Sequence, residues 1–116
     1  MIRRESECKV EVREKMRGGS GSVRVAHFWL PQELKAKSRL CARLTLEPGS
    51  SIGFHEHKGE DEVYVILHGH GVVDEGGQKV EVAAGDTVLT GNGAGHAIAA
   101  VGTEPLEMLA VIMTYG

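Results

Sequence analysis

The chain repeats a short alternation of apolar and polar residues, and this period-two pattern constrains its fold more than any other feature. The clearest run is LCARLTLE at positions 40–47, in which every second residue from Leu40 to Leu46 is apolar. Such alternation is typical of a β-strand with one buried face, and no segment longer than a few residues has the 3.6-residue period of an amphipathic helix. Further β-type runs occupy positions 23–30, 62–67, 72–74, 79–82, 87–90, 96–101 and 106–114. The pattern predicts an all-β chain.

Turn-forming residues separate these runs. The separating segments are EPGS at 47–50, EGGQ at 75–78, AGD at 84–86, GNG at 91–93 and GTEP at 102–105. The Gly76-Gly77 pair between two short runs is a typical hairpin signal. Only residues 30–38, which contain PQELKAKS, are expected to form a helical turn within an ordered connection. Many short strands without a crossover helix predict an antiparallel sandwich or barrel.

The length limits the chain to one domain of ordinary size. A chain of 116 residues, 41% of them hydrophobic, is long enough to bury one core. We therefore predict a single barrel domain at residues 23–116. Residues 1–22 are expected to be an N-terminal arm whose strand packs on the barrel or on a partner subunit. The alternative is that RGGSGS at 17–22 acts as a flexible linker.

Charge and composition argue against several classes of function. A net charge of −3 and a pI near 6.1 provide no basic field for nucleic acid. No apolar run approaches the roughly 20 residues that span a bilayer, and the start MIRRESECKVEV has no apolar signal region. Cys8 and Cys41 lack a CxxC spacing and are expected to be reduced thiols of a cytoplasmic protein. A redox or ligand role for Cys41 is the alternative.

Polar residues stand at strand positions in the stretch GFHEHKGEDEVYVILHG, which has the pattern of two strands around a polar turn. His55 and His57 are two residues apart, so in a strand they share a face. The turn returns the chain so that Glu62 lies opposite them, and His96 opens a later strand. Three imidazoles and a carboxylate suit a divalent first-row transition metal, whereas a buried carboxylate without a partner costs several kcal/mol. The alternative for each histidine is an ordinary half-buried residue that is hydrogen-bonded to a carbonyl.

Two glycine-bounded motifs in this region resemble those of the cupin superfamily of small β-barrels. The first cupin motif, which has the form glycine, HxH, glutamate, glycine, is matched by Gly49, His55, His57, Glu62 and Gly69. The second, which has the form glycine, PxG, histidine, asparagine, is matched by Gly85, Gly93 and His96. The sequence departs from the second motif at Gly91, where proline is usual, and at Ala100, where asparagine is usual. Neither departure falls on a metal ligand of the family.

This resemblance implies an antiparallel double-stranded β-helix, the jelly-roll barrel of cupins. It also implies that four side chains bind one divalent transition metal ion, and Mn, Fe, Co, Ni, Cu and Zn all accept such a set. The implied ligands are His55, His57, Glu62 and His96. Open coordination positions would give the site Lewis-acid or redox capacity.

Further residues near the motifs have a functional and an ordinary interpretation. Tyr64 shares a strand face with Glu62 and is a candidate hydrogen-bond donor or proton partner, although strand tyrosines are more often core or rim residues. Glu60 is a candidate orienting residue or proton carrier, and its alternative is a solvated turn. His68 and His70 are expected to be exposed turn residues.

The segment MRGGSG at 16–21 is similar to one in small oxalate-decarboxylase-like cupins. In bacterial oxalate decarboxylases an arginine generally lies three residues before the first motif histidine and grips the substrate carboxylate. Ile52 stands there in this sequence, and Arg43 is a substitute only if it faces inward, which the sequence leaves open. The pocket is therefore expected to be small and mostly apolar, and oxalate turnover is disfavoured.

We expect a metal-dependent enzyme that oxidises, decarboxylates or isomerises a small molecule with a carboxylate or carbonyl group. The alternatives are a non-catalytic ligand-binding or sensory module, and a structural ion, which open coordination positions disfavour. A homodimer is also expected, because Val63, Val65 and Leu67 face outward if Tyr64 and Ile66 face inward.

Overall fold

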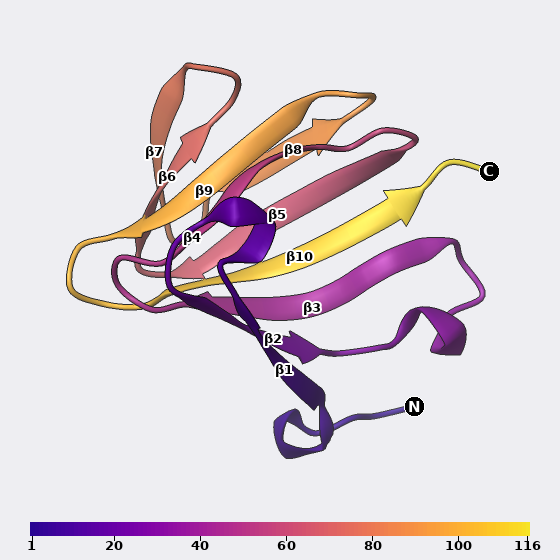
Figure 1. Cartoon of the computed structure of the whole chain (residues 1–116). Coiled ribbons are helices and arrows are strands. Elements are labelled where there is room, and N and C mark those ends of the chain that lie inside the picture. Colours follow the sequence, from indigo (N-terminus) through magenta and orange to yellow (C-terminus); the bar gives the residue numbers. More distant parts are fainter.

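Two antiparallel β-sheets pack against each other in the computed structural model, which describes residues 1–116 (Figure 1). The strands are β1 (Lys9–Glu14), β2 (Ser22–His27), β3 (Ser38–Leu46), β4 (Ser51–Glu56), β5 (Glu60–His68), β6 (His70–Asp74), β7 (Lys79–Ala83), β8 (Thr87–Gly91), β9 (Gly95–Val101) and β10 (Leu106–Thr114). The larger sheet has the order β1-β2-β3-β10-β5-β8, and the smaller has the order β4-β9-β6-β7. Single 3-10 turns form η1 (Glu5–Glu7), η2 (Met16–Gly18) and η3 (Pro31–Glu33). No helix of the chain has the length and apolarity needed to cross a membrane.

The alternating runs of the sequence form strands at the expected places. β3 follows the rule most clearly, since its residues alternate between buried and partly exposed positions. The run at 23–30 is shorter than expected, because β2 ends at His27 and the chain then turns toward η3. Pro31 begins η3 and has no backbone N–H for a strand ladder. The predicted all-β class with antiparallel sheets is confirmed.

The core lies between the sheets and is formed by the inward faces of both. Its largest fully buried aliphatic side chains are Leu44, Leu46, Ile52, Ile66, Ile98, Leu106 and Met108. On β5, the side chains of Tyr64 and Ile66 are buried, whereas those of Val63 and Val65 are partly exposed on the opposite face. The facing predicted for this strand is therefore confirmed.

Truncation of a core leucine tests this placement of the core. Leu46 is fully buried, whereas Leu89 on β8 is 69% exposed. We expect Leu46→Ala to lower the free energy of unfolding by about 2–5 kcal/mol, because it removes buried methyl groups and leaves a cavity. Leu89→Ala is the matched control and should change that free energy by less than about 0.5 kcal/mol. Urea denaturation measures both, and similar losses would contradict the assignment.

The N-terminal strand β1 is the outer edge of the larger sheet, shown in indigo in Figure 1. It pairs with β2 of the same chain along its whole length. Its valines, Val10 and Val12, are 41% and 59% exposed, whereas Arg13 is partly buried and lines an interior cavity. The apolar side of this strand therefore faces solvent, and its charged side faces the barrel.

Candidate metal centre

Four side chains converge between the two sheets and form a group that we name the ligand cluster. Its members are His55, His57, Glu62 and His96. β4 carries the first histidine, the second follows the end of β4, and β5 and β9 carry the other two residues. Their ligand atoms all lie within 4.8 Å of one another. The fold thus brings together the four residues that the sequence singled out.

An irregularity in β4 gives the first histidine its inward direction. Ile52 pairs with Ile98, and His55 pairs with His96, so the pairing shifts by one residue between these two points. Regular alternation from buried Ile52 would have turned Phe54 inward, but Phe54 is 52% exposed. Such a bulge re-aims the following side chains. His55 therefore faces the same interior as Ile52.

The donor atoms are spaced like the ligands of a single ion. Nε2 of His96 lies 3.0 Å from Nε2 of His57 and 3.2 Å from Nε2 of His55. Oε1 of Glu62 lies 3.0 Å from Nε2 of His96 and 2.8 Å from Nε2 of His57. Two ligands at right angles, each about 2.1 Å from an ion, are about 3.0 Å apart. The spacing fits one first-row transition metal ion.

Hydrogen bonds on the far side of two rings fix which nitrogen faces the cluster. Nδ1 of His55 donates to the carbonyl of Gly53 at 2.8 Å, and Nδ1 of His57 donates to the Glu60 carboxylate at 2.5 Å. Because both oxygens only accept, the opposite Nε2 atoms present lone pairs. When His57 is neutral, its Nε2 and Oε1 of Glu62, 2.8 Å apart, are two acceptors in contact, whereas a proton on Nε2 makes them a hydrogen-bonded ion pair. A metal ion between the two acceptors would turn their repulsion into binding.

Glu60, at the start of β5, holds the ring of His57 and is itself held by Arg39. The Arg39 guanidinium donates two hydrogen bonds to the Glu60 carboxylate, at 2.9 and 2.8 Å. This pairing, aided by the bond from His57 and opposed by burial, lowers the pKa of Glu60 to about 2. Glu60 is only 8% exposed, so its alternative as a solvated turn residue is wrong. The neighbouring Asp61 accepts a hydrogen bond from the Tyr115 hydroxyl.

Burial and the surrounding histidines together set the protonation of Glu62. Burial acts to raise its pKa, but hydrogen bonds with His55 and His96, together with the charges of His57 and His96, outweigh burial and lower the pKa to about 2. The carboxylate is therefore ionised at neutral pH. An ionised carboxylate is the state that a metal ion requires of this ligand.

Tyr64 lies against the cluster on the inner face of β5. Its ring stacks on that of His96, with the centroids 4.9 Å apart and the planes inclined by 10°. Burial, assisted by the nearby charge of Glu62, raises the pKa of the Tyr64 hydroxyl well above its ordinary value. The phenol therefore stays protonated near neutral pH and is a hydrogen-bond donor rather than a base.

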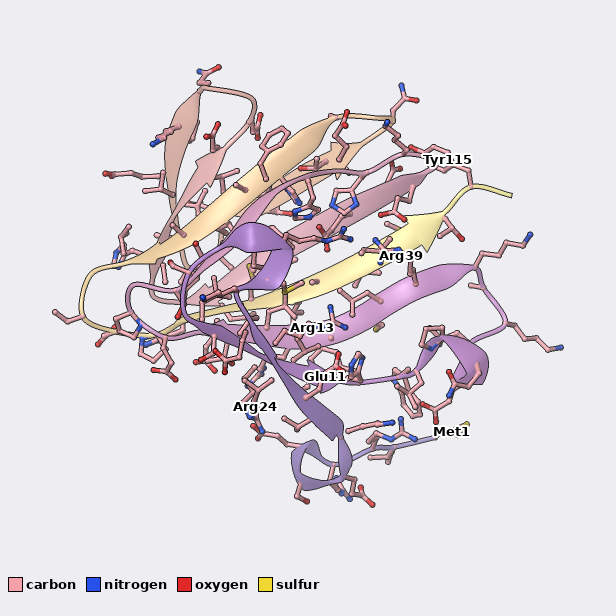
Figure 2. The ribbon with its side chains drawn as sticks, viewed as in Figure 1. Met1, Glu11, Arg13, Arg24, Arg39 and Tyr115 are labelled. Carbon is pink, nitrogen blue, oxygen red and sulfur yellow. The ribbon has the colours of Figure 1, made fainter.

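A cavity of about 160 Å³ opens onto the cluster. Three arginines line it: Arg13 from β1, Arg17 from η2 and Arg39 from β3. The expectation of a mostly apolar pocket is therefore wrong. None of the three lies in either cupin motif, and Figure 2 shows Arg13 and Arg39 on different strands, β1 and β3. Arg43 is not a substitute, because it lies on the outer face with Glu5 and Glu107.

His27, at the end of β2, also lines this cavity. Its Nε2 lies 3.2 Å from Oε1 of Glu11, which also accepts from Arg13, and its Nδ1 is buried with no hydrogen-bond partner. Since the carboxylate only accepts, Nε2 carries the proton and the buried Nδ1 presents a lone pair. Sequence reasoning did not single out His27 for the site, because it lies outside both motifs.

Other sequence-based expectations agree with the structure. Ile52 is fully buried and apolar at the position where an arginine would have pointed to oxalate. His68 and His70 are exposed on the turn between β5 and β6. Cys8 and Cys41 are free thiols. Burial raises the pKa of the Cys41 thiol, which disfavours its alternative as a reactive or ligating thiolate.

A larger groove of about 490 Å³ lies along the smaller sheet and η2. Small and apolar residues line most of it, and Asp74 and Lys79 are its charged residues. No cluster of titratable side chains converges there, so its larger volume does not make it the better candidate site. The smaller cavity, onto which the ligand cluster opens, is therefore the candidate site.

Two packed antiparallel sheets around a buried three-histidine, one-glutamate cluster define a small double-stranded β-helix barrel with a metal-type ligand set. The chain belongs to the cupin family: the Cupin domain family matches residues 42–112, the region that carries the cluster. This result confirms the resemblance found in the two sequence motifs.

Similar proteins extend this assignment to nearly the whole chain. An oxalate-binding protein of Thermotoga maritima is 45% identical over 113 residues, which cover 97% of this chain and 93% of that protein. The crystal structure of a predicted oxalate decarboxylase from Thermotoga maritima has a TM-score of 0.93 at 45% identity and covers 98% of this chain and 99% of that chain. The cupin domain of Schizosaccharomyces pombe Cnp3, with a TM-score of 0.72 and 13% identity over 91% of this chain and 69% of its own, shares the fold alone.

Proposed function

We propose that this chain holds one divalent transition metal ion in the ligand cluster and binds a small carboxylate at that ion. The observation that carries the proposal is the convergence of three imidazoles and one buried, ionised carboxylate, whose ligand atoms all lie within 4.8 Å of one another. Such a mixed imidazole and carboxylate set suits Mn, Fe, Co, Ni, Cu or Zn. A bound ion with open positions supplies Lewis-acid or redox chemistry to its ligand.

The cavity supports a small anion as the ligand. Its volume of about 160 Å³ is well below the roughly 300–1,000 Å³ of pockets for drug-sized ligands. Three arginines line the cavity, and arginine binds carboxylates through a planar fork of hydrogen-bond donors. The Thermotoga relative is an oxalate-binding protein. Oxalate and similar short dicarboxylates are therefore the first candidate ligands. This proposal differs from the expectation based on Ile52, which disfavoured turnover of oxalate.

The chain's own residues divide the work around this ligand. Glu60 is ionised and paired with Arg39, so we assign it the positioning of His57 rather than proton transfer. Tyr64 keeps its proton, so we assign it the donation of a hydrogen bond to the ligand. The apolar part of the wall, which limits the access of water, is formed by Met16, Leu40, Leu44 and Ile112.

The proposed activity is metal-dependent decarboxylation, oxidation or isomerisation of such a carboxylate, with His27 as the candidate proton acceptor. His27 lines the cavity, and the contact of its Nε2 with Glu11 orients the ring, which supports a catalytic role. A non-catalytic ligand-binding module is the second candidate. One observation supports this second candidate. The sequence suggested Tyr64 and Glu60 as proton partners, but Tyr64 stays protonated and Glu60 stays ionised.

Metal analysis followed by ligand binding tests the proposal. We expect about one equivalent of a transition metal per folded chain, and oxalate binding in calorimetry that disappears when the metal is removed. A folded protein that takes up none of the six metals would overturn the proposal. Anion chromatography of an oxalate incubation separates the two candidates: loss of oxalate supports the enzyme, and intact oxalate that remains bound supports the binding module.

Neutralising Glu60 is expected to weaken metal binding without abolishing it. Glu60→Gln removes the negative charge that pairs with Arg39. The same charge strengthens the hydrogen bond that His57 donates to Glu60, so this bond weakens in the variant. Loss of such a partner typically reduces metal affinity by about 10–100-fold. Glu56→Gln is the matched control, because Glu56 is close in sequence but exposed. Competition with a metal-binding dye measures both affinities, and equal values would show that Glu60 does not support the site.

The exposed faces of the larger sheet support the predicted homodimer. Val10 and Val12 on the edge strand β1 and Leu67 on β5 are large apolar residues left exposed in a single chain. Contact with a second copy of the chain would cover these residues and remove apolar area from water. We expect sedimentation at micromolar concentration to give a dimer, and a monomer would contradict this prediction.

A further inference from the structure

An unpaired arginine lines the cavity that opens onto the ligand cluster. Arg13 donates hydrogen bonds to Glu11, and Arg39 donates to Glu60. Arg17 lines the same cavity but forms no hydrogen bond or ion pair through its side chain. Arg17 is exposed, and it is the one arginine of the cavity lining whose guanidinium donors are all available to a ligand.

The backbone at Arg17 adopts a conformation that a residue with a side chain rarely accepts. Its φ of 54° and ψ of 30° lie in the left-handed region, and Lys15, two residues earlier, has a φ of 48°. Such conformations persist where the surrounding structure holds them, and they are enriched at ligand sites. The segment at 17–22, for which a flexible linker was the alternative interpretation, thus begins with a defined turn.

Close packing against β4 holds this turn in place. A Cβ on Gly19 would lie 2.1 Å from the backbone oxygen of Ser51, and a Cβ on Gly53 would lie 2.0 Å from the backbone oxygen of Arg17. Glycine at both positions lets the two backbones touch. The N–H of Ser20 also donates to the Ser51 hydroxyl at 2.9 Å. Because β4 carries part of the ligand cluster, these contacts fix Arg17 relative to the metal site.

The charges around the cavity match a dianion. Each of the two paired arginines is balanced by its own glutamate. A divalent ion that is offset by Glu62 would leave one positive charge, and Arg17 supplies a second. A monoanion would leave one of the two positive charges without a partner.

We propose that Arg17 is the specificity-determining residue of this site and binds the carboxylate group that distinguishes a dicarboxylate from a monocarboxylate. This inference rests on the proposed function, in which one carboxylate of the ligand binds the metal ion. Charge-assisted bonds from a planar guanidinium to a carboxylate are among the strongest hydrogen bonds of proteins. The N-terminal segment would therefore complete the ligand site that the barrel begins.

Arg17→Asn tests the inference in Mn²⁺-loaded protein, because asparagine tolerates the left-handed backbone. We expect its affinity for oxalate in calorimetry to fall by roughly 10–100-fold, which is the usual loss for one charged hydrogen-bonding partner. Its affinity for acetate should change by less than about threefold. Lys15→Asn is the matched control: it makes the same substitution in the same turn at an exposed left-handed residue outside the cavity. Its affinities for both anions should remain those of the wild type.

The measured metal content and affinities separate failure of this inference from failure of the proposed function. Arg17→Asn protein with full Mn²⁺ and unchanged oxalate affinity would overturn the role of Arg17 alone. Equal losses for oxalate and acetate would overturn its selectivity for dianions. A wild-type protein that takes up none of the six metals, or takes up one of them but binds no oxalate, would overturn both. If Arg17→Asn does not fold, Arg17→Gly carries the same test, since glycine accepts the left-handed backbone freely.

Discussion

Removal of the metal is expected to lower the midpoint of thermal unfolding by about 10 °C relative to the metal-loaded protein. Without a metal ion, ligand atoms 2.8–3.2 Å apart in a buried site either face one another as lone pairs or must take up protons. A metal present at about 100 times its Kd stabilises the folded state by about 2.7 kcal/mol, and each kcal/mol corresponds to about 4 °C in a domain of this size. Scanning calorimetry with and without a chelator measures the difference.

Two double variants control this experiment. His57→Ala with His96→Ala removes two members of the ligand cluster, and its unfolding midpoint should not respond to metal or chelator. His68→Ala with His70→Ala is the matched control, because these histidines have the same HxH spacing as the first motif but are exposed. It should keep the full response. A wild-type midpoint that stays unchanged when the metal is removed would contradict the site.

Gly19→Ala is expected to retain the metal and to lose at least about tenfold in affinity for oxalate. A Cβ at this position would lie 2.1 Å from the backbone oxygen of Ser51 and 2.9 Å from the backbone nitrogen of Gly53. These are backbone atoms that cannot rotate away, so η2 must move off β4 and carry Arg17 with it. The ligand cluster lies on other elements and should still bind one ion. Metal analysis and calorimetry with oxalate measure the two properties on the same sample.

A neighbouring glycine provides the control for this substitution. A Cβ on Gly18 would meet nothing within 4 Å, and the residue has a φ of 81°. Gly18→Asn therefore adds a side chain to the same turn without a clash, and asparagine tolerates this backbone. We expect it to keep its oxalate affinity within about threefold of the wild type. Oxalate binding that survives Gly19→Ala would show that the position of η2 does not matter to the ligand.

Much of the fold could be predicted because burial imposes a period of two on a strand. In β5, the alternation of Tyr64 and Ile66 with Val63 and Val65 was enough to assign each side chain to the core or to the outer face. Glycine and proline marked the turns for an equally local reason, since they permit backbone angles that other residues avoid. Such effects act over a few residues, so one sequence is sufficient to recognise them.

Sequence reasoning was less reliable where the regular period is broken. The bulge in β4 turns His55 rather than Phe54 inward, and only the motif compensated for this shift. The pairing of β3 with β10 also shifts beside Arg39, which then reaches Glu60 instead of following the outward face of its strand. A solvated turn was the alternative for Glu60, whereas its partners hold it in the interior. No alternation signals a bulge, because contacts with the neighbouring strand decide where it forms.

The sequence by itself determined the all-β class, most strand positions and the four residues of the ligand cluster, because these depend on local periodicity and on two short motifs. Only the tertiary structure decided what surrounds the cluster. KVEVRE at 9–14 has an apolar face that local rules would bury, yet the structure exposes Val10 and Val12 and directs Arg13 into the cavity. The direction depends on the pairing of β1 with β2 and on the packing of η2 against β4. Both are contacts between segments that are distant in sequence, so the polarity of the pocket became known only from the folded chain.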